Sequence, residues 1–241
     1  EAYEFFKELE FKNFLSRFQD KGEQVKAEEA FQKVEELDLA EEIFQKAEEK
    51  EEIGLEVLEE GDSFLGLALS WEEDGKISVY GFLPQGFLTR DYLMEKAADL
   101  CGYGKMVASL DIKAMLRHMD IREHTAMFDA GIAAYLLNPL KSQYTYDDIA
   151  KEYLGEILPA KEDLIGKLTY LKAAKDEAGE QEVVKSICYM AYVALKARKP
   201  LLEALEDMTE KQATCFPNNG TVPLNDKTVG ALRQYLHSAV E

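Results

Sequence analysis

The sequence predicts an α/β fold in which a mixed sheet is flanked by helices, with helical extensions at the amino- and carboxyl-terminal ends. Three strand-like runs follow one another between residues 53 and 82, and strands then alternate with helices between residues 105 and 155. With 241 residues and 46% hydrophobic content, the chain is long enough to bury a complete core.

The first 50 residues predict helices on either side of a linker. Residues 1–19 form an amphipathic pattern, because large apolar residues lie on or near one helical face: Tyr3, Phe6, Leu9, Phe14 and Phe18. Residues 20–35 are polar and charged and predict a linker. A short helix is expected from Asp38 to Lys50, with four residues facing inward: Leu39, Ile43, Phe44 and Ala47.

The sheet is expected to begin with three consecutive antiparallel strands over residues 53–58, 64–71 and 76–82. Glu72-Glu73-Asp74-Gly75 supplies a hairpin turn between the second and the third. Thr89-Arg90-Asp91 then begins a helix that runs to about Leu100.

Two short strands that each lead into an aspartate organise the next part of the chain. The run from Met106 to Leu110 leads into Asp111, and the run from Thr125 to Phe128 leads into Asp129. An aspartate at the point where a strand gives way to a helix suits an N-cap, because its carboxylate accepts the free N–H groups of the first turn. The helix after Asp111 carries Ile112, Met115 and Leu116 on one side.

Helices are expected from Asp129 onward. The first has apolar residues at helical spacing, namely Ile132, Ala133, Leu136 and Leu137, and Asn138-Pro139 closes it. The second runs from Tyr146 to Leu154 and ends at Gly155.

The remaining sequence is also predicted to be helical. Residues 161–175 carry Leu164, Leu168 and Leu171 at helical spacing. Residues 181–206, broken near Pro200, carry Val184, Ile187, Tyr192 and Leu195 and predict the central helix against the sheet. A loop and a final helix, residues 228–240, are expected within residues 214–241.

The segment FDAGIAAYLLNP, followed by YTYDDIAKEYLG, resembles the second half of the 3′–5′ proofreading exonuclease domain of bacterial family A DNA polymerase, DNA polymerase I. The resemblance covers residues 1–208 and implies an RNase H-like fold. It divides the chain into a helix and charged linker (1–35) that joins a 5′-nuclease domain, an exonuclease-like domain (36–208), and a carboxyl-terminal loop and helix (209–241) of unclear origin. Because the segment from Glu1 to Phe18 is similar to the family's inter-domain junction, a start at Glu1 suggests an excision point.

The resemblance also implies where a metal site should lie. In that family four acidic residues on three motifs hold two metal ions, and the first motif is Asp-x-Glu. It falls here on Glu56-Val57-Leu58. Leu58 cannot bind a hard cation, which needs oxygen ligands. Glu56 is either a residual metal ligand or a surface acid in an acidic neighbourhood.

The other two motifs are also altered. The second falls on Asp111, which is either a ligand or a helix cap, and Asp129 corresponds to a family acid that is not a ligand. The third, Tyr-x-x-x-Asp, places Ser186 at the tyrosine and Met190 at the aspartate. Tyr189 and Tyr192 are expected in the core.

These replacements predict a catalytically inactive exonuclease-like domain that acts as a scaffold in DNA replication and repair synthesis, with no cofactor. One alternative is an active Mg²⁺- or Mn²⁺-dependent 3′–5′ exonuclease that uses Glu56, Asp111 and either Asp62 or Asp129. Another is a self-standing acidic interaction module, whose residues 1–50 bind a basic partner.

The net charge of −19 argues against strong binding of DNA by this chain alone, because DNA-binding proteins carry basic surfaces. We expect DNA contact through the parent polymerase and packing against the adjacent polymerase and 5′-nuclease domains. The relatively basic region, a solvated helix face or a weak phosphate-facing patch, contains Lys151, Lys161, Lys167, Lys172, Lys175, Lys196, Arg198 and Lys199.

Other site classes receive little support. Cys101, Cys188 and Cys215 are odd in number and read as reduced thiols. The histidines, His118, His124 and His237, lie apart. There is no nucleophile-elbow, Walker or dinucleotide pattern. The sequence also lacks an apolar run near the roughly 18 residues of a membrane span and has no signal peptide, so we expect a cytoplasmic location.

Overall fold

The computed structural model describes residues 26–102, 105–117, 119, 126–141 and 143–215. Its strands are Phe31–Val34 (β1), Glu52–Glu60 (β2), Ser63–Glu73 (β3), Lys76–Phe82 (β4), Met106–Ser109 (β5) and Ala126–Asp129 (β6). Its longer helices are Leu37–Glu48 (α3), Arg90–Cys101 (α4), Ala130–Leu137 (α6) and Glu177–Cys215 (α10). Shorter helical segments are Ala27–Ala30 (η1, a 3₁₀ turn), Ile112–Leu116 (α5), Tyr146–Ile149 (α7), Ala150–Leu154 (η2, a π-helical turn), Lys161–Ile165 (α8) and Tyr170–Ala173 (α9).

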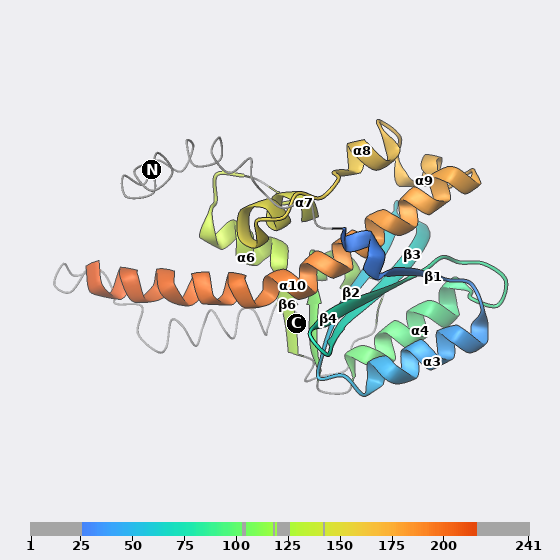
Figure 1. Cartoon of the computed structure of the whole chain (residues 1–241), viewed down its shortest axis with the longest axis horizontal. Coiled ribbons are helices and arrows are strands. Elements are labelled where there is room, and N and C mark those ends of the chain that lie inside the picture. Colours follow the sequence, from blue (N-terminus) through green and yellow to red (C-terminus); the bar gives the residue numbers. More distant parts are fainter. Residues whose placement is uncertain (1–25, 103–104, 118, 120–125, 142, 216–241) are drawn as a thin grey trace.

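The strands form one mixed sheet in the order β1-β4-β3-β2-β5-β6. Helix α10 crosses one face of this sheet, and α3 and α4 lie together on the other (Figure 1). The predicted α/β class, a mixed sheet flanked by helices, is therefore confirmed.

Strands β2, β3 and β4 are antiparallel, as the sequence predicted. Asp74 and Gly75 connect β3 to β4 with φ angles of 52° and 75°. Positive φ at both central residues matches the right-handed twist of a two-residue hairpin. Strands β5 and β6 then continue the sheet in parallel with β2.

The predicted helix starts are confirmed by their capping bonds. The Thr89 side chain accepts a hydrogen bond from the Tyr92 N–H at 3.2 Å at the start of α4. Asp111 and Asp129 cap α5 and α6 in the same way. Each cap satisfies a backbone donor that the first helical turn leaves without a partner.

The predicted linker over residues 20–35 is wrong for residues 27–34. Phe31–Val34 forms β1, which pairs in parallel with Val79–Phe82 at the edge of the sheet. Ala27 and Val34 are buried, at 4% and 0% exposure. This strand was not predicted from the sequence, because the strand is only four residues long and has Gln32 and Lys33 at its centre. The folded unit thus begins before residue 36.

Helix α10 is continuous over 39 residues, so the predicted break near Pro200 is wrong. A proline inside a helix removes one backbone hydrogen bond and crowds the preceding turn. Here the neighbours on the same helix, Ala197 and Leu201, are completely buried. Their packing offsets the local cost and keeps the helix intact.

Glycines on three adjacent strands allow α10 to lie close to the sheet. A Cβ at Gly54 of β2 would lie 2.5 Å from the Ala191 carbonyl oxygen, and one at Gly66 of β3 would lie 2.8 Å from the Ile187 side chain. A Cβ at Gly81 of β4 would lie 2.8 Å from side chains of the same helix. We call Gly54, Gly66 and Gly81 the glycine track. It holds α10, the predicted central helix, at one position on the sheet.

Two apolar cores lie on opposite faces of the sheet. One packs α10, α6 and α7 against the sheet and contains Tyr189 and Tyr192, which are 2% and 4% exposed, as expected. The other packs α3 and α4 against the sheet and contains Phe44 and Trp71. Each face of the sheet is therefore buried.

The single helix predicted over residues 161–175 is wrong. Gly166 adopts a φ of 62° after α8, and the chain does not become helical again until α9. Leu168 and Leu171 are 51% and 42% exposed rather than inward. Ile132 of α6 is also exposed, although it shares helical spacing with buried residues.

The amphipathic helix predicted over residues 1–19 and the final helix predicted over residues 228–240 lie outside the described residues. Among the helices of the described ranges, none combines the length and the hydropathy needed to cross a bilayer.

Lys105 joins the start of β5 to the end of α3. Lys105 is buried, with 4% exposure. The ammonium group donates hydrogen bonds to the carbonyl oxygens of Ala47 at 2.7 Å and Lys50 at 3.0 Å, and to that of Glu48. A cation suits this position because the carboxyl-terminal carbonyls of a helix carry partial negative charge.

We expect Lys105→Met to destabilise the fold by about 3 kcal/mol, because it leaves three carbonyl groups without their charged donor. Lys46→Met, at an exposed lysine of α3, is the control and should change stability by less than about 0.5 kcal/mol. Urea unfolding of both variants checks this. Equal effects of the two substitutions would contradict the capping role.

Candidate acidic site at the carboxyl ends of the strands

Three carboxylates gather where β5 and β6 end, beside the middle of β2. Strand β2 is parallel to β5, and β5 is parallel to β6, so their carboxyl ends meet at one edge. Glu56 lies on β2, Asp111 follows β5, and Asp129 is the last residue of β6. The favoured interpretation of the sequence treated Asp129 as a helix cap alone, and the active-exonuclease alternative offered it as one possible third acid.

Glu56 is buried, with 6% exposure, so the interpretation as a surface acid is wrong. Its carboxylate accepts the Leu110 N–H at 2.5 Å, and the Leu110 carbonyl accepts the Gly131 N–H at the start of α6. The pKa of Glu56 is raised to about 8, mainly by burial and to a smaller extent by the charges of Asp129 and Asp111. The Leu110 bond acts in the opposite direction.

Asp111 is exposed and caps α5, and its carboxylate accepts the Ala114 N–H at 2.9 Å. This confirms the predicted N-cap. Its charge also acts on both Glu56 and Asp129. The carboxylate therefore lies near the other two while one of its oxygens is already bonded to the backbone.

Asp129 bridges two helices. One carboxylate oxygen accepts the Ile132 N–H of α6 at 2.7 Å, and the other accepts the Ile112 N–H of α5 at 2.9 Å. The residue is 6% exposed. Its pKa is raised to about 6, mainly by burial and to a smaller extent by the charge of Asp111, and the backbone hydrogen bonds oppose the rise. The predicted N-cap is confirmed, but its second bond was not foreseen.

The two apolar replacements lie at the same side of the sheet as α10. Leu58 lies on β2 opposite Gly66, and Met190 lies on α10. Both are partly buried and pack against the core beneath that helix. Ser186 is completely buried. Side chains at these positions therefore pack within the fold.

These residues do not fit a two-metal centre. Such a centre needs several carboxylate oxygens that converge on ions roughly 3.5–4 Å apart. Leu58 and Met190 offer no oxygen. Across the described ranges, no group of three or more His, Cys, Asp or Glu side chains is placed so that it could hold a metal ion.

Other candidate residues fall elsewhere. Asp62 is exposed in the turn after β2. Cys101 and Cys188 are buried thiols. His118, His124 and His237 and the side chain of Cys215 lie outside the described residues. Among the candidate basic residues, Arg198 pairs with Glu52 at 2.6 Å. Lys161 is partly buried, whereas Lys167, Lys172 and Lys175 are exposed.

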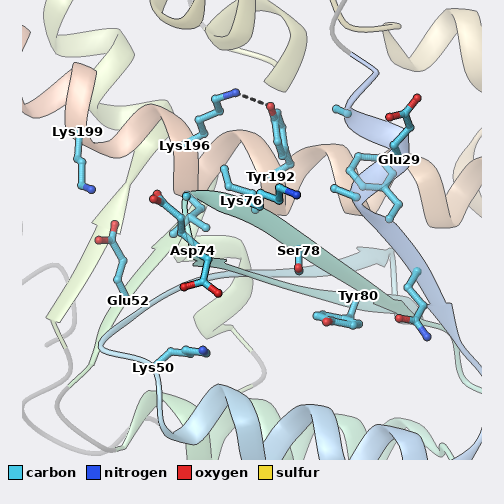
Figure 2. A pocket seen from close by; sticks show the side chains of 18 of the residues that line it. Glu29, Lys50, Glu52, Asp74, Lys76, Ser78, Tyr80, Tyr192, Lys196 and Lys199 are labelled. Carbon is cyan, nitrogen blue, oxygen red and sulfur yellow. Dashed lines mark hydrogen bonds between the residues drawn. The ribbon is translucent and has the colours of Figure 1, made fainter.

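A cavity of about 1250 Å³ opens at the amino-terminal end of β2, away from the carboxylates. Figure 2 shows Lys50 and Tyr80 on one side of the sheet, with Tyr192 and Lys196 on the other. Lys196 bonds Glu156 at 2.5 Å and the Tyr192 hydroxyl at 2.6 Å. Sequence reasoning missed the buried Glu156, because its partners lie about 40 residues later. Charges of both signs line this cavity, so it favours neither anions nor cations.

Solved structures similar to this chain include two RNase D proteins and one EXO domain. Escherichia coli RNase D, described as an exoribonuclease involved in structured RNA processing, has a TM-score of 0.51 at 11% identity, over 86% of this chain and 50% of that one. Trypanosoma brucei RNase D gives 0.49 at 10%, over 86% and 81%. The Aedes aegypti Nibbler EXO domain gives 0.43 at 10%, over 89% and 98%.

The chain thus spans half the length of the Escherichia coli protein. No family model and no curated protein matches the sequence. The similarity to Escherichia coli RNase D confirms the predicted RNase H-like fold.

The buried acids predict a stability that falls as the pH rises. Folding raises the pKa of Glu56 from 4.5 to about 8, so its contribution is complete below about pH 4.5 and is lost as the pH rises through 8. Asp129 acts in the same direction. Since one pKa unit is about 1.4 kcal/mol, the loss from Glu56 is on the order of 3–5 kcal/mol.

Glu56→Gln removes this titration. We expect the variant to be more stable than the parent at pH 9 and to lose less stability between pH 5 and pH 9. Glu72→Gln, at an exposed position of β3, is the control and should keep the parent profile. Thermal unfolding across this pH range checks both variants. A Glu56→Gln profile identical to the parent's would show that burial does not raise the pKa of Glu56.

Proposed function

We propose that this chain is the exonuclease-like domain of a bacterial DNA polymerase I and that it no longer cleaves nucleic acid. Its role is then structural, as a scaffold between the 5′-nuclease and polymerase domains during DNA replication and repair synthesis in the cytoplasm. The observation that carries the proposal is the packing of Leu58 and Met190 where the resembling family has metal-binding acids.

The engagement of the remaining acids supports the same proposal. Glu56 holds the Leu110 N–H, and Asp111 caps α5. Each of these carboxylates already accepts a backbone hydrogen bond and is therefore suited to joining structural elements. Each is also repelled by its acidic neighbours. Losing several ligands from a unit that acts together reduces the rate by orders of magnitude.

Retention of the fold without the metal site has a physical reason. Buried carboxylates without a cation are costly, and Leu58 and Met190 replace two of them with apolar surface. The domain therefore holds its core without a bound metal, and DNA reaches it through the parent polymerase. We propose that the domain begins at residue 27, because η1 and β1 belong to the fold.

An active metal-dependent 3′–5′ exonuclease is the second candidate. The proximity of Glu56, Asp111 and Asp129 favours it, because the charges of Asp111 and Asp129 raise the pKa of Glu56 and that of Asp111 raises the pKa of Asp129. Bound Mg²⁺ or Mn²⁺ would supply a neutralising charge and an activated water. The bonds of Asp129 to two helices count against its use as a ligand.

The acidic-module alternative has less support. Within residues 1–50, η1, β1 and α3 pack into the fold, and Ile43 and Phe44 are buried. Deleting residues 1–50 would remove part of the domain as well as any partner site.

A paired assay separates the first two candidates. We expect no stoichiometric Mn²⁺ binding in calorimetry and no 3′-end trimming of labelled single-stranded DNA or RNA at saturating Mn²⁺. The double variant Leu58→Glu/Met190→Asp should bind Mn²⁺ at least about tenfold more tightly than Leu58→Gln/Met190→Asn, which matches its size without its charge. Stoichiometric binding and trimming by the parent chain would overturn the proposed loss of cleavage.

Met190 also gives a stability test. Met190→Asp should lower the melting temperature by about 5 °C, because it places a charge against an apolar core without a cation. Met190→Leu keeps the apolar volume and should change it by less than about 2 °C. A higher melting temperature for Met190→Asp would count strongly against the replacement of ligands by packing.

A further inference from the structure

Helix α6 presents its small side chains to the core and its large ones to the outside. Ala130, Ala133 and Ala134 are at most 2% exposed. Ile132 and Tyr135, on the opposite side, are 40% and 47% exposed. An ordinary surface helix has the reverse arrangement, with polar residues outward.

The apolar surface continues past the helix. Leu140, after the turn at Pro139, is 80% exposed. We call Ile132, Tyr135 and Leu140 the α6 face. None of the eight residues of α6 is charged, and a helix that is apolar on all sides is normally covered on all sides.

The sequence offers one segment with matching chemistry. Residues 1–18 are rich in large apolar residues that follow a helical pattern: Tyr3, Phe6, Leu9, Phe14 and Phe18. The segment contains lysine and arginine as well as glutamate, so it meets no repulsion from the uncharged α6. An amphipathic helix that lays its apolar side on an apolar surface buries both.

The described chain begins on the correct side of the sheet for this contact. Ala27 belongs to the same apolar core as the buried alanines of α6. Glu28 accepts a hydrogen bond from the Tyr189 hydroxyl at 2.7 Å. The Tyr189 ring stacks on Tyr146 of α7 with centroids 5.8 Å apart, and α7 follows α6 in the chain. The described part of the chain therefore begins close to α7.

The connection is long enough. Residues 19–25 span up to about 23 Å when extended, and packed helices lie about 8–10 Å apart. We propose that residues 1–18 pack as an amphipathic helix on the α6 face, so that the α6 face is an intramolecular docking surface.

Photo-crosslinking of the complete chain tests this proposal. p-Benzoylphenylalanine at position 135 replaces an exposed aromatic ring with a larger one, which preserves the fold. After irradiation, peptide mapping should find intramolecular links to residues 1–18. The same group at Phe87, which is 81% exposed in the loop between β4 and α4, is the control and should give at least fivefold fewer such links.

A second comparison tests the aromatic contact. Phe6→Asp/Phe14→Asp should reduce the position-135 links at least fivefold. Asn13→Asp/Gln19→Asp adds the same charge without removing a ring and should leave them unchanged. Links to residues 216–241, links between two copies, or a yield no higher than at position 87 would each overturn the proposal.

Discussion

The close approach of α10 to the sheet is the constraint on which the rest of the structure depends. Gly54, Gly66 and Gly81 leave no room for a Cβ beneath this helix. The Ser70 hydroxyl also donates to the Ala191 carbonyl at 2.8 Å, which adds a polar contact to the same crossing. The contact of α10 with these glycines fixes where Met190 and Ser186 lie relative to β2. It also creates the core into which α6, α7 and η1 pack.

The acidic cluster shows how a fold can use carboxylates as internal connectors. Glu56 bonds the backbone between β5 and α5, and Asp129 joins the starts of α5 and α6. Helix amino termini carry partial positive charge, which favours acids at these positions. Like charge opposes this arrangement, because Asp111 and Asp129 raise the pKa of Glu56 and Asp111 raises the pKa of Asp129. Hydrogen bonds from the backbone to these carboxylates thus hold this part of the sheet together. They offset the unfavourable burial of the acids and the repulsion between their charges.

Local signals predicted most of the fold. The hairpin at Asp74-Gly75 and the caps Thr89, Asp111 and Asp129 act within a few residues, so the sequence contains their whole cause. Strand β1 was missed because its stability comes from pairing with β4, which lies almost fifty residues later. Pro200 was taken as a break because the burial of its neighbours cannot be seen locally. At the site, the resemblance placed Glu56 and Asp111, but the burial of Glu56 and the bridge made by Asp129 depend on how β2, β5 and β6 come together.

The continuity of α10 has a mechanical consequence. At 1.5 Å per residue, its 39 residues extend about 58 Å, well beyond the glycine track that seats it. The carboxyl-terminal end of α10 can then rotate only together with the sheet, because the helix is rigid along its length. One inserted residue beyond Leu201 would rotate everything after it by about 100° and advance it by about 1.5 Å. The angular phase of this helix, as much as its length, sets the direction in which the chain continues.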